Sequence, residues 1–186
     1  MRVVSGSVKG KRLCAVKGLF IRPTSDKIRE SVFNILGHTF HYKHVLDLFA
    51  GTGAMGIEAL SRGAESAVFV DSNYAVIKII RKNLDICGFS KRAKVLKIDV
   101  IQALSLKPLA SNLFDLIFID PPYEAGFTDA IIEIIDKNVM LTKDGIIVSE
   151  TSKRIVSKPA LSHLEEFDKR RYGDTIVTFY RNKERS

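Results

Sequence analysis

The sequence has few of the residues that build disulfide frameworks, metal clusters or membrane spans. Only two cysteines, Cys14 and Cys87, occur among its 186 residues, and their wide separation fits neither zinc-ligand spacing nor a disulfide framework. No stretch approaches the ~18 uncharged apolar residues of a membrane-spanning helix. Residues 1–13 lack the apolar run of a secretory leader. We therefore expect a cytoplasmic protein with no metal site and no membrane contact.

The chain also lacks internal repeats and low-complexity linkers, so its length sets its organisation. A chain of 186 residues with 46% apolar content is long enough for one sizeable core and cramped for two. We predict a basic, RNA-binding N-terminal extension over residues 1–24 and one main domain over residues 25–186. The expected oligomeric state is a monomer.

The net charge of +8 is unevenly distributed along the chain. Residues 1–30 carry an excess of six positive charges and residues 152–186 an excess of four, whereas residues 31–151 carry two more acids than bases. Basic ends around a slightly acidic middle are expected when appendages of a core contact a polyanion. A surface selected only for solubility is the alternative. The candidate contacts with nucleic acid phosphates are Arg2, Lys9, Lys11 and Arg12.

The middle of the chain alternates between strand-like and helical patterns. Short apolar runs predict strands at residues 44–50, 66–71, 93–99, 113–120 and 145–150. Helical spacing of apolar residues predicts helices at residues 54–63, 73–88 and 127–140. Nearly continuous apolar strands that alternate with helices indicate a parallel sheet covered on both faces. The predicted fold is a doubly wound, Rossmann-like α/β domain.

Both ends depart from this alternation. Towards the C-terminus, two strand-like runs flank Gly173 and Asp174, which predicts an antiparallel hairpin at the edge of the sheet. Towards the N-terminus, residues 2–17 indicate a small hairpin with glycine turns, and residues 25–36 have the spacing of an amphipathic helix that ends at Gly37. We expect a mostly parallel, seven-stranded sheet with an antiparallel end, preceded by a hairpin and helix.

Acidic residues stand at the ends of four predicted strands. Asp47 lies near the end of the first, and Asp71, Asp99 and Asp120 end the next three. Ligands of open α/β sheets bind beyond the carboxyl ends of the strands, near the point where strand order reverses. We therefore expect the four carboxylates to surround one site. The alternative for each is a structural role, because Asp after a strand often caps the following helix.

Gly51, Gly53 and Gly56 form a GxGxxG pattern between the first strand and the next helix, with Asp71 twenty residues beyond Gly51. The same pattern is the fingerprint of dinucleotide-binding enzymes, so an NAD-linked oxidoreductase is a serious alternative. Asp47 distinguishes a dinucleotide from a cationic cofactor. A carboxylate beside the loop repels a pyrophosphate but attracts a cofactor that carries a sulfonium and an ammonium. The inferred cofactor is S-adenosylmethionine.

This choice assigns roles to the residues around the loop. Ala50, Gly51 and Gly53 form the tight turn that brings backbone N–H groups close to the cofactor. Asp71 is expected to accept hydrogen bonds from the ribose hydroxyls, and Asp99 from the adenine amino group. Together with Asp47, these residues are the predicted cofactor site.

The segment LIFIDPPYEAG, residues 116–126, runs from an apolar strand directly into Asp120, Pro121, Pro122 and Tyr123. An exocyclic amine of a nucleobase is a poor nucleophile because its lone pair is delocalised into the ring. The Asp120 carboxylate and the Pro121 carbonyl can each accept one of its N–H groups and aim that lone pair at the methyl group. Proline fixes φ and lacks an N–H, and a tyrosine ring can stack on a flipped-out base. These four residues are the catalytic candidates, and a strand-ending turn is the alternative.

The combination of segments resembles a known family. DLFAGTGAMGIEALSRGA (47–64) and FIDPPY (118–123) are similar to amino methyltransferases of the Rossmann-like class. SGSVKGKRL (5–13), RPTSDKIRESVFNIL (22–36) and RRYGDT (170–175) narrow the likeness to the bacterial 16S ribosomal RNA guanine-N2 methyltransferases of the RsmD type. The resemblance covers nearly the whole chain. It implies a class I S-adenosylmethionine-dependent methyltransferase fold.

The resemblance also implies a substrate and two further site residues. The acceptor would be the exocyclic N2 of a guanine in 16S rRNA, within an assembling small ribosomal subunit. Arg22 would contact the methionine carboxylate or the RNA, and Thr24 would lie beside the cofactor; a helix-entry turn capped by Thr24 is the alternative.

Other functions stay open on the residues alone. A non-catalytic RNA-binding assembly factor would use the basic ends without turnover. Among methyltransferases, the DPPY segment suits adenine N6 or cytosine N4 equally well, in DNA or RNA. Only the family resemblance selects guanine.

Overall fold

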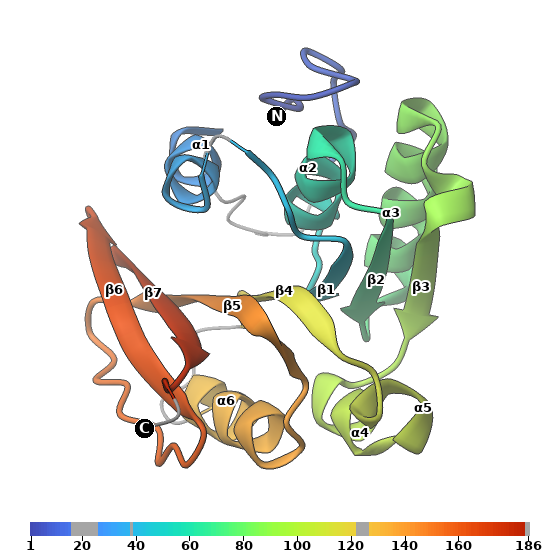
Figure 1. The fold of residues 1–186 in the computed structure, drawn as a ribbon. Coiled ribbons are helices and arrows are strands. Elements are labelled where there is room, and N and C mark those ends of the chain that lie inside the picture. Colours follow the sequence, from blue (N-terminus) through green and yellow to red (C-terminus); the bar gives the residue numbers. More distant parts are fainter. Residues whose placement is uncertain (16–25, 38, 122–126, 185–186) are drawn as a thin grey trace.

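A computed structural model describes residues 1–15, 26–37, 39–121 and 127–184 of the chain. Within them, seven strands form one sheet in the order β3-β2-β1-β4-β5-β7-β6 (Figure 1). The strands are β1 (His44–Leu48), β2 (Ser66–Asp71), β3 (Ala93–Lys97), β4 (Phe114–Ile119), β5 (Leu141–Ser152), β6 (Leu164–Tyr172) and β7 (Thr175–Asn182). Strands β1 to β5 pair in parallel, and β7 is antiparallel to both of its neighbours. The predicted sheet is confirmed.

Helices cover both faces of this sheet. Figure 1 shows α1, α2 and α3 on one face and α4, α5 and α6 on the other. Their bounds are α1 (Asp26–Ile35), α2 (Ala54–Arg62), α3 (Tyr74–Cys87), α4 (Val100–Ser105), α5 (Lys107–Ala110) and α6 (Phe127–Lys137), with a short 3-10 helix η1 (Ser90–Arg92). The three layers make the doubly wound α/β domain that the alternating pattern indicated.

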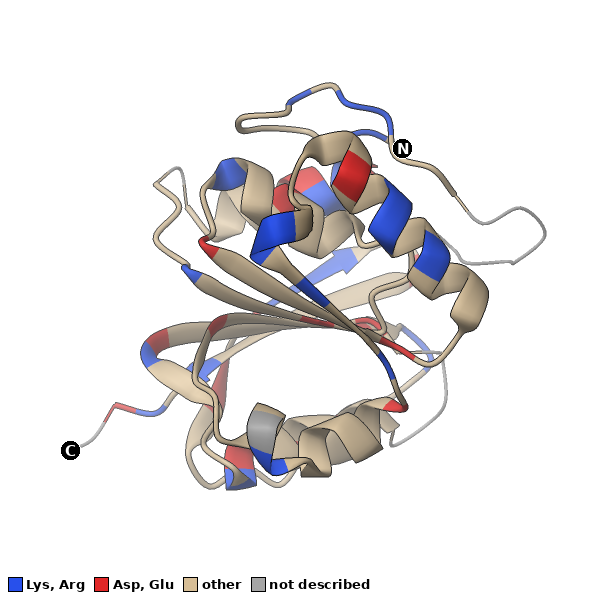
Figure 2. Ribbon diagram, turned by 90° about the vertical axis from the view of Figure 1, so that its right-hand side faces the viewer, with Lys and Arg blue, Asp and Glu red and all other residues tan. Residues whose placement is uncertain are grey.

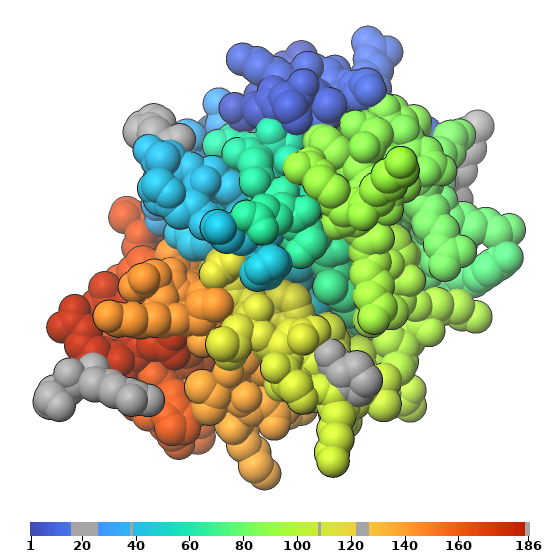
Figure 3. Space-filling view, turned by 45° about the vertical axis from the view of Figure 1, so that its right-hand side comes forward, coloured from blue at the N-terminus to red at the C-terminus, as the bar shows by residue number. Residues whose placement is uncertain are grey.

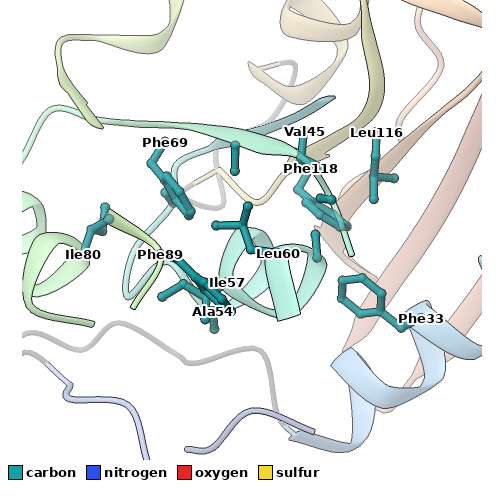
Figure 4. Packing of buried hydrophobic residues seen from close by; sticks show 14 of the residues in the cluster. Phe33, Val45, Ala54, Ile57, Leu60, Phe69, Ile80, Phe89, Leu116 and Phe118 are labelled. Carbon is teal, nitrogen blue, oxygen red and sulfur yellow. The ribbon is translucent and has the colours of Figure 1, made fainter. Parts of the chain in front are cut away.

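One hydrophobic cluster fills each interface between sheet and helices. Leu116 and Phe118 of β4 point into the cluster under α1 to α3, where Phe69 packs as well (Figure 4). Ile117 and Ile119 of the same strand point into the cluster against α4 to α6. Successive residues of a strand face opposite sides of the sheet. A continuous apolar run is therefore the pattern required of β4, which is buried on both faces.

Several predicted boundaries differ from the observed ones. Helices α4 and α5 were missed, because helices of one or two turns show too little periodicity to detect. Strand β5 begins at Leu141 rather than at residue 145, since a register shift between Phe114 and Leu116 of β4 accommodates the extra residues. Helix α6 ends at Lys137 rather than at residue 140, and Val139 beyond it has a left-handed φ of 49°.

The predicted N-terminal hairpin is present in short form, as an antiparallel bridge between Arg2 and Arg12 flanked by backbone hydrogen bonds between the two arms. We call residues 1–15 the N-terminal segment. Other backbone groups of the segment bond to α2. The buried Glu58 carboxylate accepts the N–H groups of Val4 at 2.7 Å and Ser5 at 2.9 Å, and the Ser61 hydroxyl donates to the Ser5 carbonyl at 2.6 Å. The segment is thus packed onto the domain.

Gly6 allows this close approach. Its φ is +83°, and a Cβ at this position would lie 1.9 Å from the backbone oxygen of Ser61. Gly10 has nearly the same φ, +85°, but a Cβ there would meet nothing within 4 Å. The two glycines therefore share a backbone conformation and differ in their surroundings.

We expect Gly6→Ala to separate the N-terminal segment from α2 and to lower the free energy of unfolding by clearly more than Gly10→Ala. The Gly10 variant incurs only the ~1–2 kcal/mol of a left-handed residue with a side chain. Urea denaturation of both variants measures the difference. Equal losses would contradict the close packing of Gly6 on Ser61.

Candidate active site at the carboxyl edge of the sheet

The carboxyl ends of β1 and β4 lie side by side where the strand order reverses. Strand β1 pairs with β2 on one side and β4 on the other, and Leu48 is opposite Ile119 in the parallel ladder. Neighbouring strands are about 4.8 Å apart. The chain leaves β1 into the glycine loop and leaves β4 into the half-buried Asp120 and the buried Pro121. The two motifs singled out in the sequence therefore start next to each other.

Left-handed backbone conformations shape the loop after β1. The φ angles of Phe49, Gly51 and Gly53 are 58°, 53° and 77°, and a non-glycine residue such as Phe49 is uncommon in this region. The Gly53 N–H donates to the Ala50 carbonyl at 2.7 Å, and the Ala50 N–H donates to the Val70 carbonyl of β2 at 3.1 Å. The loop is a fixed turn tied to the neighbouring strand.

Asp47 is buried beneath this loop, with 3% of its surface exposed. Its Oδ2 accepts the Gly56 N–H at 2.9 Å. Burial raises the pKa of Asp47 to about 7; the Gly56 hydrogen bond opposes this shift and the charge of Asp71 adds to it. A cation in the site would restore the charge of this carboxyl. Asp47 is therefore suited to a cationic ligand, and its role in the cofactor site stays a prediction.

The third glycine of the pattern has a packing role. A Cβ at Gly56 would lie 2.4 Å from the Phe69 ring and 3.1 Å from Asp47 Oδ2. The absence of a side chain lets α2 approach β2 and places the Gly56 N–H on the buried carboxylate. Gly56 therefore supports the site from behind.

The carboxylates of Asp71 and Asp99 both accept hydrogen bonds from backbone N–H groups. Asp71 Oδ2 accepts the Gly51 N–H at 3.2 Å and Oδ1 accepts the Asn73 N–H at 2.9 Å; partial burial raises the pKa of Asp71 and these hydrogen bonds oppose the shift. Asp99 is the N-cap of α4 and accepts the N–H groups of Ile101 and Gln102, which is the structural role considered for it. Their contacts with ribose and adenine stay predictions.

Sequence reasoning missed Asn83, which connects the N-terminal segment to the glycine loop. Asn83 is fully buried on α3. Its Oδ1 accepts the Cys14 N–H at 2.8 Å, and its Nδ2 donates to the carbonyls of Cys14 at 3.1 Å and Thr52 at 2.9 Å. The one sequence signal for it is an amide on the otherwise apolar inner face of a helix, since a buried amide needs partners.

Some predicted site residues cannot be placed. Arg22, Thr24, Pro122 and Tyr123 lie outside the described residues, so their roles stay predictions. The four candidate phosphate contacts, Arg2, Lys9, Lys11 and Arg12, are all exposed on the N-terminal segment. In the described part of the chain, no three His, Cys, Asp or Glu residues gather as they would around a metal ion. None of the helices described there is long and apolar enough to cross a bilayer.

Comparison with known proteins gives consistent likenesses over nearly the whole chain. The family model described as "Conserved hypothetical protein 95" matches residues 1–181. The Bacillus subtilis protein named "Putative rRNA methyltransferase YlbH" is 41% identical over 183 residues, which cover 98% of this chain and 100% of that protein. "Ribosomal RNA small subunit methyltransferase D" of Haemophilus influenzae is 32% identical over 155 residues, covering 82% of this chain and 79% of that protein.

A solved structure, "Putative methyltransferase yhhF from Escherichia coli", superposes with a TM-score of 0.84 at 28% identity and covers 100% of this chain and 99% of its own. This likeness confirms the fold expected from the sequence.

Replacing Asp47 by Asn should change how stability depends on pH. The folded pKa of about 7 lies above the ~3.9 of an unfolded Asp, so the folded state holds an extra proton between these values. The contribution of Asp47 to stability therefore falls as the pH rises through this window and is constant above it. Asp47→Asn keeps an acceptor for Gly56 and cannot ionise. The stability of the variant relative to the wild type should rise from about pH 4 to about pH 7 in denaturant titrations; a flat difference would contradict the raised pKa.

Asn83→Ala should weaken cofactor binding as well as stability, because it leaves backbone groups of Cys14 and Thr52 without a buried partner. We expect a loss of about 2 kcal/mol in the free energy of unfolding and a clear loss of affinity for S-adenosylmethionine by calorimetric titration. Leu84→Ala, at the next position of α3, removes core packing without touching this network. If Leu84→Ala lowers the affinity equally, Asn83 has no specific role at the loop.

Proposed function

The chain belongs to the family described as conserved hypothetical protein 95, and from this premise we propose that it transfers a methyl group from S-adenosylmethionine to ribosomal RNA of the small subunit. Relatives at 41% and 32% identity carry the names of rRNA methyltransferases, which agrees with the activity predicted from the sequence. The proposal includes the exocyclic N2 of a guanine as the acceptor. It also includes the cytoplasm as the location, an assembling small subunit as the substrate and a monomeric enzyme.

The residues at the carboxyl edge fit this cofactor. When bound, S-adenosylmethionine supplies an electrophilic methyl group on a positively charged sulfur. The buried Asp47, with its pKa of about 7, favours a cation and disfavours the pyrophosphate of NAD. Asp71 is held at the loop by the Gly51 N–H, where its carboxylate is available for ribose hydroxyls. The NAD-linked alternative does not explain why the carboxyl of Asp47 is buried beside the loop.

The observation that carries the proposal is the pairing of Leu48 with Ile119. It sets the glycine loop, which we propose holds the cofactor, beside the strand end that we propose holds the acceptor. Asp120 and the carbonyl of Pro121 would each accept an N–H of the target amine and orient its lone pair. The Asp120 carboxylate would then receive the proton that the amine loses after transfer. Such orientation needs a rigid support, and β4 is buried on both faces.

The test is methylation of rRNA by the purified protein with S-adenosylmethionine, on free RNA and on subunits, followed by mass spectrometry of the modified nucleoside. N2-methylguanine in 16S rRNA is the expected product. N6-methyladenine or N4-methylcytosine would support the other amine acceptors, and no incorporation would refute the enzyme.

Asp120→Ala should reduce methyl transfer to background while the affinity for S-adenosylmethionine stays within about threefold of the wild type, since the role of Asp120 lies with the acceptor. Asp144→Ala, which removes an exposed acid from β5, is the matched control and should remain active. An active Asp120→Ala enzyme would remove this residue from the mechanism.

A further inference from the structure

We propose that α3 and the end of β3 carry the RNA-binding surface onward from the N-terminal segment to the carboxyl edge of the sheet, with Tyr74 as a platform on which an RNA base stacks. The inference rests on the proposed function, because it takes RNA as the substrate. It assigns RNA contacts to a part of the chain whose summed charge is slightly acidic.

The exposed face of α3 is basic. Lys78, Arg81 and Lys82 are exposed and stand on one side of the helix, while the opposite side is buried in the core. One acid of α3, Asp85, lies on this exposed face. Its carboxylate accepts a hydrogen bond from the Ser90 hydroxyl. Three cations along one helix face form a row that matches a run of phosphates.

Tyr74 gives this surface an aromatic element. It is the first residue of α3, three positions after Asp71, and is 58% exposed. The ammonium groups of Lys78 and Lys97 lie 4.4 Å and 5.3 Å from its ring centroid. A lysine over an exposed ring is held weakly, so both can turn to phosphates when a base occupies the ring. Aromatic platforms flanked by cations are the usual means of holding single-stranded RNA.

The basic face of α3 is continuous with the N-terminal segment. Lys11 donates to the Ile86 carbonyl at 2.6 Å, at the last turn of α3, and Cys14 is bonded to Asn83. Figure 3 shows the N-terminal segment directly against the helical layer, and Figure 2 shows basic residues on both. Helix α3 has 14 residues and spans about 20 Å. The three cations occupy about one turn of this helix, between the Lys11 contact at Ile86 and Tyr74 beside the candidate active site.

Four cations of the C-terminal part are paired with carboxylates, whereas Arg171 of β6 donates to the Gly173 carbonyl. Arg170 pairs with Asp168 and Arg181 with Glu165, each at 3.0 Å, and further pairs join Lys153 to Asp174 and Lys169 to Glu166. In the described parts of the chain, the cations of α3 and of the N-terminal segment form no ion pair with a carboxylate. A polyanion gains more from cations that have no carboxylate partner, so the α3 face is favoured over the C-terminal strands.

The test compares two triple variants with the same change in net charge. Lys78→Gln, Arg81→Gln and Lys82→Gln together remove the α3 row, and Lys153→Gln, Lys169→Gln and Arg181→Gln remove paired cations as the control. Binding to a 16S rRNA fragment should weaken about 100-fold at about 0.1 M salt in the α3 variant, with a shallower salt dependence, and only a few-fold in the control. S-adenosylmethionine affinity should be unchanged in both. Lysines of the edge strand β3 are left intact, because they also discourage strand pairing.

Two single variants isolate the stacking contact. Tyr74→Ala should weaken RNA binding about tenfold, and Tyr74→Phe, which keeps the ring, should bind like the wild type. The inference would be overturned if the two triple variants lost RNA affinity equally, or if the α3 variant bound RNA as strongly as the wild type. In either case an active wild type would still support the proposed function. A wild type that transfers no methyl group to RNA would refute the function itself. Stronger binding of the wild type to anionic lipid vesicles than to RNA would make the face a membrane surface and would also overturn the inference.

Discussion

The parallel pairing of β1 with β4 is the constraint on which the site depends. These strands are distant in the sequence, and the chain forms β2 and β3 on one side of β1 before it returns to the other. Both strands are buried on both faces, so a slip of one residue would exchange the side chains of the two clusters. It would also move the strand end that carries Asp120 by about 3.3 Å relative to the glycine loop. The core therefore fixes the distance between the two halves of the site.

The N-terminal segment supports the same site from the outer side of the helices. Asn83 bonds to Cys14 and to Thr52, so the loop proposed to hold the cofactor and the segment proposed to meet RNA share one buried side chain. Glu58 holds the segment at its other end through Val4 and Ser5. A segment that serves only as a charged tail would need no such buried polar contacts. Its packing indicates that its position relative to the loop matters.

The sequence predicted the elements whose signals are local. Continuous apolar runs located the strands, and the loop between β1 and α2 was evident because its left-handed turns require glycine. Asn83 was not predicted, since its partners are backbone groups 31 and 69 residues away. The basic face of α3 was hidden by summing charge along the chain, because a sum counts buried Asp47 and Glu58 equally with exposed Lys78. Burial decides which charges a partner meets, and the sequence does not state burial.

Burial also separates two electrostatic effects at this edge, the attraction of a small cation and the attraction of a polyanion. Asp47 lies under the loop, where its charge acts at short range and in poor solvation, which suits recognition of a small cation. The lysines of α3 and of the N-terminal segment are exposed, where their charges act together over about 8–10 Å of salt solution. A polyanion approaching the edge therefore meets the exposed lysines first and is shielded from the buried Asp47. In the proposed function, the same edge would attract an anionic substrate and hold a cationic cofactor, because the opposing charges lie at different depths.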